Sequence, residues 1–159
     1  MMNTRVVRSV KAQSSLELLI TLAFGLVILL PIVVLAFIQI ANSSSTLSAT
    51  EAQAAASKLA SVATSVSSQG YPAKQLVLIQ MPQSVTNIYV GTTTGSPGHE
   101  IIIVVSTNAG PSYVTAYTPV NVSGTLTAIT SPGVYLVNVS AQNSCPSNIG
   151  YSCVYIAST

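Results

Sequence analysis

One uncharged stretch constrains this chain more than any other feature. No charged side chain occurs between Leu18 and Thr50, and 17 of the residues from Leu18 to Ile40 are Leu, Ile, Val or Phe. About 24 apolar residues at 1.5 Å each give roughly 36 Å of helix, and a bilayer's hydrocarbon layer is about 30 Å thick. Exposing those 17 side chains to water would forgo roughly 25 to 50 kcal/mol. We therefore predict a helix that lies in lipid or among copies of itself.

The few charges are distributed unevenly along the chain. Charged residues make up 5% of the sequence, with five Lys or Arg and three Asp or Glu, whereas about 25% is usual for soluble domains. Three of the cations, Arg5, Arg8 and Lys11, precede the apolar run. The positive-inside rule then places the amino terminus in the cytoplasm and the residues after Ala41 outside. No basic surface remains to hold a phosphate backbone, so nucleic acid is not an expected partner.

Two ordinary interpretations of the apolar run are a secretory signal and an uncleaved anchor. Secretory signals have an apolar core of about 7 to 15 residues and a small-x-small cleavage site. Here the run is longer, and Gln39-Ile40-Ala41 lacks the first small residue. An anchor gains nothing from Glu17, whose carboxylate costs up to about 2.5 to 3.5 kcal/mol if carried toward the bilayer centre. The alternative role of Glu17 is a first-turn acid at the positive end of the helix dipole.

The segment Lys11-Ala12-Gln13-Ser14-Ser15-Leu16-Glu17-Leu18 resembles the class III signal peptide of archaeal type IV pilin-like proteins. The resemblance covers a cation and a small residue, then Gln, a Ser two positions on, and Glu at the fifth mature position before the apolar helix. It implies that a prepilin peptidase cuts on the cytoplasmic side, between Ala12 and Gln13. The departure from the family pattern is Ala12, where Gly is commoner.

Such a cut would change the charge at the head of the helix. It removes all three leading cations and leaves a new ammonium group on Gln13, one helical turn from Glu17. The resemblance implies that Glu17 then meets the amino terminus of a neighbouring subunit, which neutralises both charges in an apolar filament core. The other residues that we assign to assembly lie in the apolar run: Leu18, Phe24, Pro31 and Phe37. Pro31 either loosens the helix locally or is a tolerated transmembrane proline.

The helix is expected to continue beyond the apolar run as far as residue 69. The segment from Asn42 to Ser48 is poor in helix formers and is a candidate weak point. Gly70 is a C-cap signal, with Pro72 just beyond. An apolar stripe follows helical spacing and would pack either against the globular domain or against a neighbouring helix: Ala52, Ala55, Leu59, Val62 and Val66.

Residues 70–159 have the composition of a β-rich domain. Gly, Pro and Asn turn signals separate seven short β-rich runs: 75–80, 85–90, 100–106, 113–118, 124–129, 134–140 and 152–156. The run from Ile101 to Val105 is uniformly branched and is expected to be central. We predict an α+β chain with a long N-terminal hydrophobic α-helix followed by an antiparallel β-sandwich head domain. Its parts are a cleavable signal at 1–12, the helix at 13–69 and the sandwich at 70–159.

The sequence offers little for catalysis or metal binding. Cys145 and Cys153 are the only cysteines, and outside a cell we expect them to form a disulfide contributing roughly 2 to 3 kcal/mol. His99 and Glu100 are adjacent, so they point to opposite faces of a strand. The chain contains no aspartate, which excludes a Ser-His-Asp triad, and two thiols with one distant His do not make a zinc site. We expect no enzyme activity, metal or cofactor.

Three Asn-x-Ser sequons are candidate glycosylation sites, at Asn42, Asn121 and Asn138. About two are expected by chance in a chain of this composition, so their number alone indicates little. Asn138 is favoured because it falls on the polar side of its predicted strand.

These patterns together predict the structural subunit of an archaeal type IV pilus-like surface filament that serves adhesion. Its expected partners are copies of itself in a helical homopolymer, a prepilin peptidase and the pilus assembly machinery. The precursor would lie in the cytoplasmic membrane and the product in an extracellular filament. The alternatives are an archaellin-like motility filament subunit, a minor pilin, and a membrane-anchored monomeric extracellular binding module.

Overall fold

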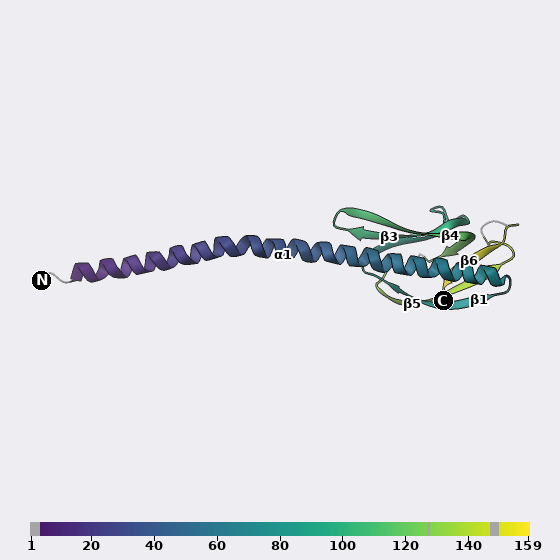
Figure 1. The fold of residues 1–159 in the computed structure, drawn as a ribbon, viewed down its shortest axis with the longest axis horizontal. Helices are drawn as coiled ribbons and strands as arrows, with labels where there is room; N and C mark the ends of the chain where they lie inside the picture. The colour runs from purple at the N-terminus through teal and green to yellow at the C-terminus, as the bar shows by residue number, and fades with distance from the viewer. Residues whose placement is uncertain (1–3, 127, 147–149) are drawn as a thin grey trace. The chain divides into compact units, whose positions relative to one another are not determined.

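The computed structural model consists of one long helix followed by β-strands (Figure 1). It describes the backbone of residues 4–126, 128–146 and 150–159, and the side chains of these ranges from Ser15 onward. The chain divides into two units, Met1–Asn42 and Ser43–Thr159. The elements in chain order are α1 (Thr4–Gln69), β1 (Lys74–Met81), β2 (Val85–Gly91), β3 (Gly98–Thr107), β4 (Gly110–Thr125), β5 (Gly133–Gln142) and β6 (Cys153–Ser158).

Helix α1 is continuous across two positions where the sequence suggested a weakness. It includes Pro31, and it runs through the hydroxyl-rich segment 42–48 without a break. The helix ends where predicted, because Gly70 adopts a left-handed conformation with φ of 74°. The N–H of Gly70 donates to the carbonyl of Ser67 at 3.1 Å, which closes the last turn.

The described strands form one hydrogen-bonded sheet in the order β1-β5-β6-β4-β2-β3, with a further pairing between β3 and β4. All of these pairs are antiparallel except β4 with β6, which is parallel. The predicted α+β class is therefore confirmed, with the long apolar helix first and a mainly antiparallel β domain after it.

The predicted number of strands is corrected from seven to six within the described ranges. The runs 113–118 and 124–129 were expected to be separate strands, but 110–125 is the single strand β4, and a turn follows in which the N–H of Ile129 donates to Leu126. Residues 110–117 of β4 pair with β3, and residues 122–125 pair with β2 and β6, with one further β3 pair at Val122. One strand therefore changes partners along its length where the sequence suggested a turn.

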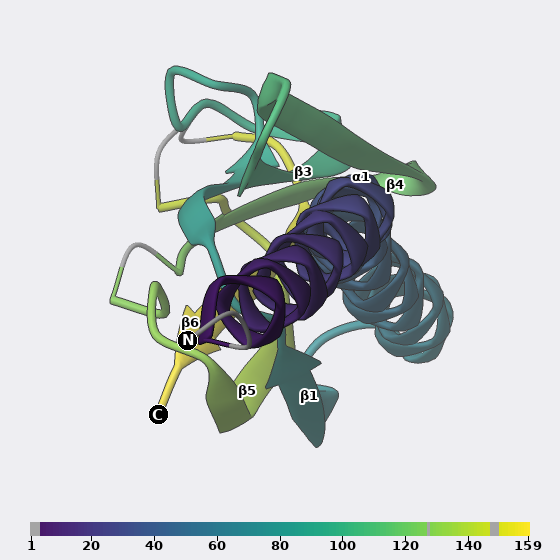
Figure 2. The ribbon, with the colours of Figure 1, turned by 90° about the vertical axis from the view of Figure 1, so that its left-hand side faces the viewer.

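This change of partners gives the β domain two halves joined through β4. Figures 1 and 2 show the part of α1 in the second unit lying between the β3–β4 half and the β1–β5 half. The strands approach closely at Gly124, where a Cβ atom would collide with the carbonyl oxygen of Ile156 on β6. Glycine at this position allows the parallel β4–β6 pair to form.

The core lies between the helix and the sheet. Four residues of the predicted helical stripe, Ala52, Ala55, Leu59 and Val66, are buried, and Val62 is partly buried against the same cluster. The stripe packs against the sheet domain, which decides between the two alternatives that the sequence left open. The run from Ile101 to Val105 is buried throughout, at 7% exposure or less. Because β3 pairs with β2 along one edge and with β4 along the other, its expected central position is confirmed.

Candidate functional site

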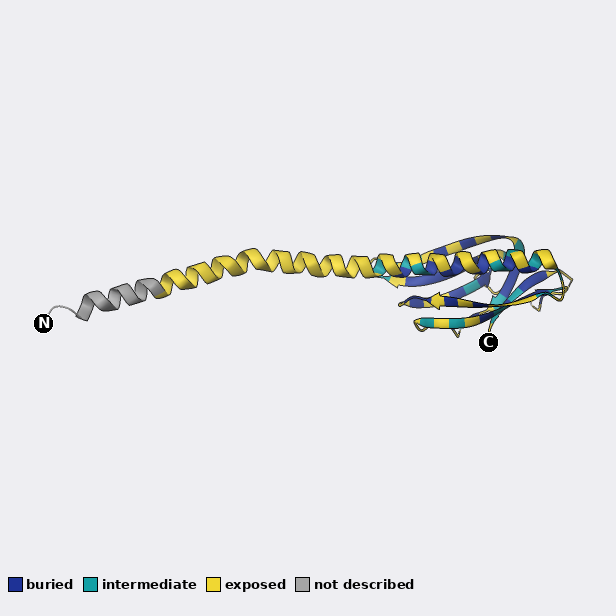
Figure 3. Ribbon diagram, turned by 60° about the horizontal axis from the view of Figure 1, so that its bottom comes forward, coloured by how far each residue is buried: buried dark blue, intermediate teal, exposed yellow. Residues whose placement is uncertain are grey.

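The most unusual surface of the molecule is the apolar segment of α1. Every large apolar side chain from Leu16 to Ile40 is between 48% and 69% exposed (Figure 3). The most apolar window of the helix has a mean hydropathy of 3.0, and none of that window is buried. By length and composition the helix is able to cross a membrane.

The exposed apolar side chains surround this segment on all sides. Successive residues of an α-helix are about 100° apart, so an unbroken apolar run leaves no polar face. Three of the residues assigned to assembly, Leu18, Phe24 and Phe37, are among the exposed side chains. The fourth, Pro31, lies within the same part of the helix. A helix of this kind is stable in water only if something else covers it.

Glu17 is the only charged residue in this exposed segment. Its carbonyl oxygen accepts a hydrogen bond from Thr21 Oγ1 at 2.7 Å, and its side chain is exposed. The cations among the described side chains are Lys58 and Lys74, and both belong to the other unit of the chain. The predicted cleavage residues Lys11, Ala12 and Gln13 have side chains outside the described part.

The predicted disulfide between Cys145 and Cys153 is present. Their Cα atoms are 5.6 Å apart, and both residues are buried. The N–H of Cys145 donates to the carbonyl of Tyr151 at 2.9 Å, which adds a second connection across the same loop. The disulfide therefore attaches the segment after β5 to the first residue of β6.

The three sequons lie in different environments. Asn121 is on β4 and Asn138 is on β5; both are half-buried, and the serines of their sequons, Ser123 and Ser140, are 2% and 3% exposed. Asn42 lies on α1, and its whole triplet is exposed. The favoured residue from the sequence, Asn138, does lie on the outer side of its strand, but its sequon is less accessible than that of Asn42.

His99 and Glu100 lie at the start of β3, where both are exposed. His99 Nδ1 is 3.3 Å from the carbonyl oxygen of Thr118, and its ring stacks on Tyr117 with 6.1 Å between the centroids. Among the described residues, no group of three or more His, Cys, Asp or Glu side chains is placed to hold a metal ion.

The structure also contains a pocket of about 340 Å³ in the second unit, which the sequence did not indicate. Residues from the end of α1 and from β3, β4, β5 and β6 line it, together with the loop after the helix. Four residues named in the sequence analysis line it: Gly70, His99, Asn121 and Cys153. Since these segments are distant in the sequence, no local pattern predicts their convergence.

Comparison of the chain with protein-family models, curated proteins and solved structures finds no match.

Proposed function

We propose that the chain is a structural subunit of an archaeal type IV pilus-like surface filament. It enters the cytoplasmic membrane as a precursor, loses residues 1–12, and polymerises through its apolar helix. The observation that carries the proposal is the apolar surface from Leu16 to Ile40, which is exposed on every side and begins beside a single carboxylate at Glu17.

The apolar surface supports assembly because it needs a cover on every side. Lipid provides that cover for a precursor, and the helices of other copies provide it after extraction from the membrane. A soluble monomer would leave 17 large side chains in water, at roughly 1.5 to 3 kcal/mol each. Packing among identical helices removes this cost without lipid.

Glu17 supports assembly over simple anchoring. Once residues 1–12 are removed, the sequence of its own unit contains no Lys or Arg, so a cationic partner for this carboxylate would come from another copy. The ammonium group of a processed neighbour, on Gln13, has the required charge. An ion pair inside an apolar core is tolerated only when both members are present, because a single buried charge is strongly destabilising.

The second unit has the features of an exported domain. The disulfide requires an oxidising environment to form and persist, and the positive-inside rule places this unit outside the cell. In the filament this β domain forms the outer surface and serves adhesion.

The test is to shear cells that produce the chain and pellet the released material by ultracentrifugation. Immunogold labelling with antibodies raised against the β domain is expected to decorate filaments along their whole length. A single-span membrane protein of the same cells serves as the control and is expected to stay with the cell bodies.

The proposal is contradicted if the chain stays entirely in the membrane fraction with that control. That result would favour the monomeric binding module, with the helix as an anchor only. Labelling restricted to filament ends would identify a minor subunit rather than the main one.

A further inference from the structure

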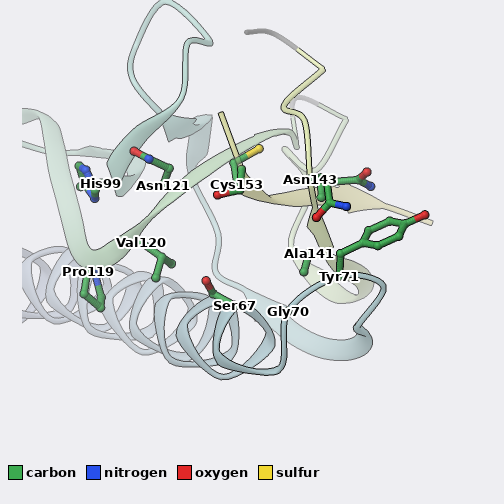
Figure 4. Close-up of a pocket in the computed structure, with 12 residues that line it drawn as sticks. Ser67, Gly70, Tyr71, His99, Pro119, Val120, Asn121, Ala141, Asn143 and Cys153 are labelled. Atoms are coloured by element: carbon green, nitrogen blue, oxygen red, sulfur yellow. The ribbon is translucent and has the colours of Figure 1, made fainter. Parts of the chain in front are cut away.

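The pocket belongs to the second unit, whereas the exposed apolar segment from Leu16 to Ile40 belongs to the first (Figure 4). Ser67 comes from the last turn of α1, and Gly70 and Tyr71 come from the loop that follows the helix. Figure 4 shows Tyr71 and Asn143 on one side of the pocket and His99 and Asn121 on the other. The volume of about 340 Å³ is near the lower end of the roughly 300 to 1,000 Å³ typical of small-molecule sites.

The lining of this pocket carries no fixed charge. Among the described residues that line it there is no Lys, Arg, Asp or Glu, and His99 contributes its one imidazole ring. The carboxyl end of α1 contributes a partial negative charge, which disfavours anions. A cation would find no carboxylate to pair with. The electrostatics therefore favour a neutral ligand.

The polar side chains of the pocket have unused hydrogen-bonding capacity. Within the described part of the chain, the side chains of Tyr71, Asn121 and Asn143 form no hydrogen bond, while Gln142 Nε2 donates to Ser140 Oγ at 3.3 Å. Each asparagine side chain can donate through its NH₂ group and accept through its carbonyl oxygen, and the Tyr71 hydroxyl can also donate and accept. A ligand rich in hydroxyl groups, which also donate and accept, matches this set.

Apolar surface accompanies the polar groups. The Tyr71 side chain is 61% exposed, and Figure 4 shows its ring at the rim of the pocket, directed away from His99 and Asn121, so it would contact a part of the ligand that extends out of the pocket. Pro119, Val120 and Ala141 add aliphatic surface to the lining. An aromatic ring with a polar end contacts amphipathic ligands well, because its face is apolar while its hydroxyl binds water or ligand.

We propose that this pocket binds a neutral carbohydrate, such as the terminal one or two sugar units of a glycan. Sugar rings combine apolar C–H faces with neutral hydroxyl groups, which is the combination that the lining presents. The pocket is preorganised, because the end of α1 is closed by a hydrogen bond and Cys153 is fixed by the disulfide. Rigid walls lower the entropy cost of binding.

The test uses the full chain in micelles of a detergent without sugar groups, so it does not depend on filament assembly. Lactose, cellobiose, maltose and mannobiose are titrated as neutral probes, with sialyllactose and glucose 6-phosphate as anionic ones. Binding is measured by saturation-transfer NMR and calorimetry. We expect at least one neutral disaccharide to bind saturably and to shift the backbone resonances of Val120 and Ala141.

Matched variants locate the binding site. Tyr71→Ala and Asn143→Ala are each expected to weaken binding by about tenfold or more, as removal of one well-placed contact does. Tyr113→Ala removes another tyrosine, 65% exposed on β4 and outside the pocket, and is expected to leave the affinity unchanged. Thermal unfolding checks that all three variants are folded.

The proposal is overturned if no neutral probe binds saturably or if the anionic probes bind more tightly than the neutral ones. It is also overturned if Tyr113→Ala weakens binding as much as Tyr71→Ala. If a variant is unfolded, the resonance shifts of the unaltered chain decide instead. Shifts confined to residues outside the pocket would then contradict the assignment.

Discussion

Leu47 and Leu59 lie on the same helix and belong to the same unit, but their environments are opposite. Leu59 is fully buried against the sheet, whereas Leu47 is 59% exposed. In the sequence, only the helical spacing of apolar residues distinguishes these two leucines: Leu59 falls on the apolar stripe and Leu47 does not. Helical spacing therefore predicted part of the helix face that enters the core, but it missed Ala56, Ala60 and Ala63, which are also buried, and it could not say what would cover that face.

This contrast gives a prediction about stability. Leu59→Ala is expected to lower the free energy of unfolding of the second unit by about 2 to 5 kcal/mol, because it removes buried surface and leaves a cavity. Leu47→Ala is the matched control and is expected to change it by less than about 0.5 kcal/mol. Denaturant unfolding of the full chain in micelles, followed by tyrosine fluorescence, measures both. Equal losses in the two variants would contradict the packing described here.

A second prediction concerns Glu17 and assembly. Glu17→Gln removes the charge that we pair with the amino terminus of a neighbour, so that ammonium group would remain alone in an apolar core. We expect the amount of filament in sheared material to fall about tenfold or more, since removing one partner of a buried pair costs about 3 to 5 kcal/mol.

Glu100→Gln is the control, because it makes the same substitution on an exposed residue of β3. It is expected to leave the filament yield unchanged. Normal filaments from the Glu17 variant would refute the role given to this carboxylate.

At the scale of elements, strand β4 shows what local patterns miss. The helix was predictable because its apolar run, its stripe and its C-cap glycine are all local signals. In β4, by contrast, the residues around 119–124 resemble a turn, and their strand pairing is decided by partners on β2 and β6. The seven-strand prediction failed there because strand pairing joins residues far apart in sequence. The pocket escaped prediction for the same reason.

Gly124 provides the test of this part of the sheet. Gly124→Ala is expected to destabilise the second unit by about 1 to 3 kcal/mol or more, because its Cβ atom would meet the carbonyl oxygen of Ile156. The collision involves backbone on both strands, so a change of rotamer cannot relieve it.

The control is Gly25→Ala, since a Cβ atom at Gly25 has no neighbour within 4 Å. It is expected to leave the unfolding of the second unit unchanged. Amide hydrogen exchange in β4 and β6 provides a local measure, and unchanged protection in the Gly124 variant would contradict the close approach of these strands.

At the scale of the whole molecule, the chain combines two units with different solvent requirements. The first unit has an apolar helical surface that is exposed on every side. The second unit has a buried hydrophobic core and a disulfide between Cys145 and Cys153. Hydropathy predicted this division without the structure. Neither hydropathy nor the structure of one copy determines what covers the helix, because that depends on other molecules.

The most direct test of the central claim is amino-terminal sequencing of the chain in material sheared from producing cells. Cleavage between Ala12 and Gln13 followed by assembly predicts that Gln13 is the first residue of the filament-borne protein. Recovery of the chain only from membranes, with Met1 or Asn3 still at its amino terminus, would contradict the claim that it is a processed filament subunit.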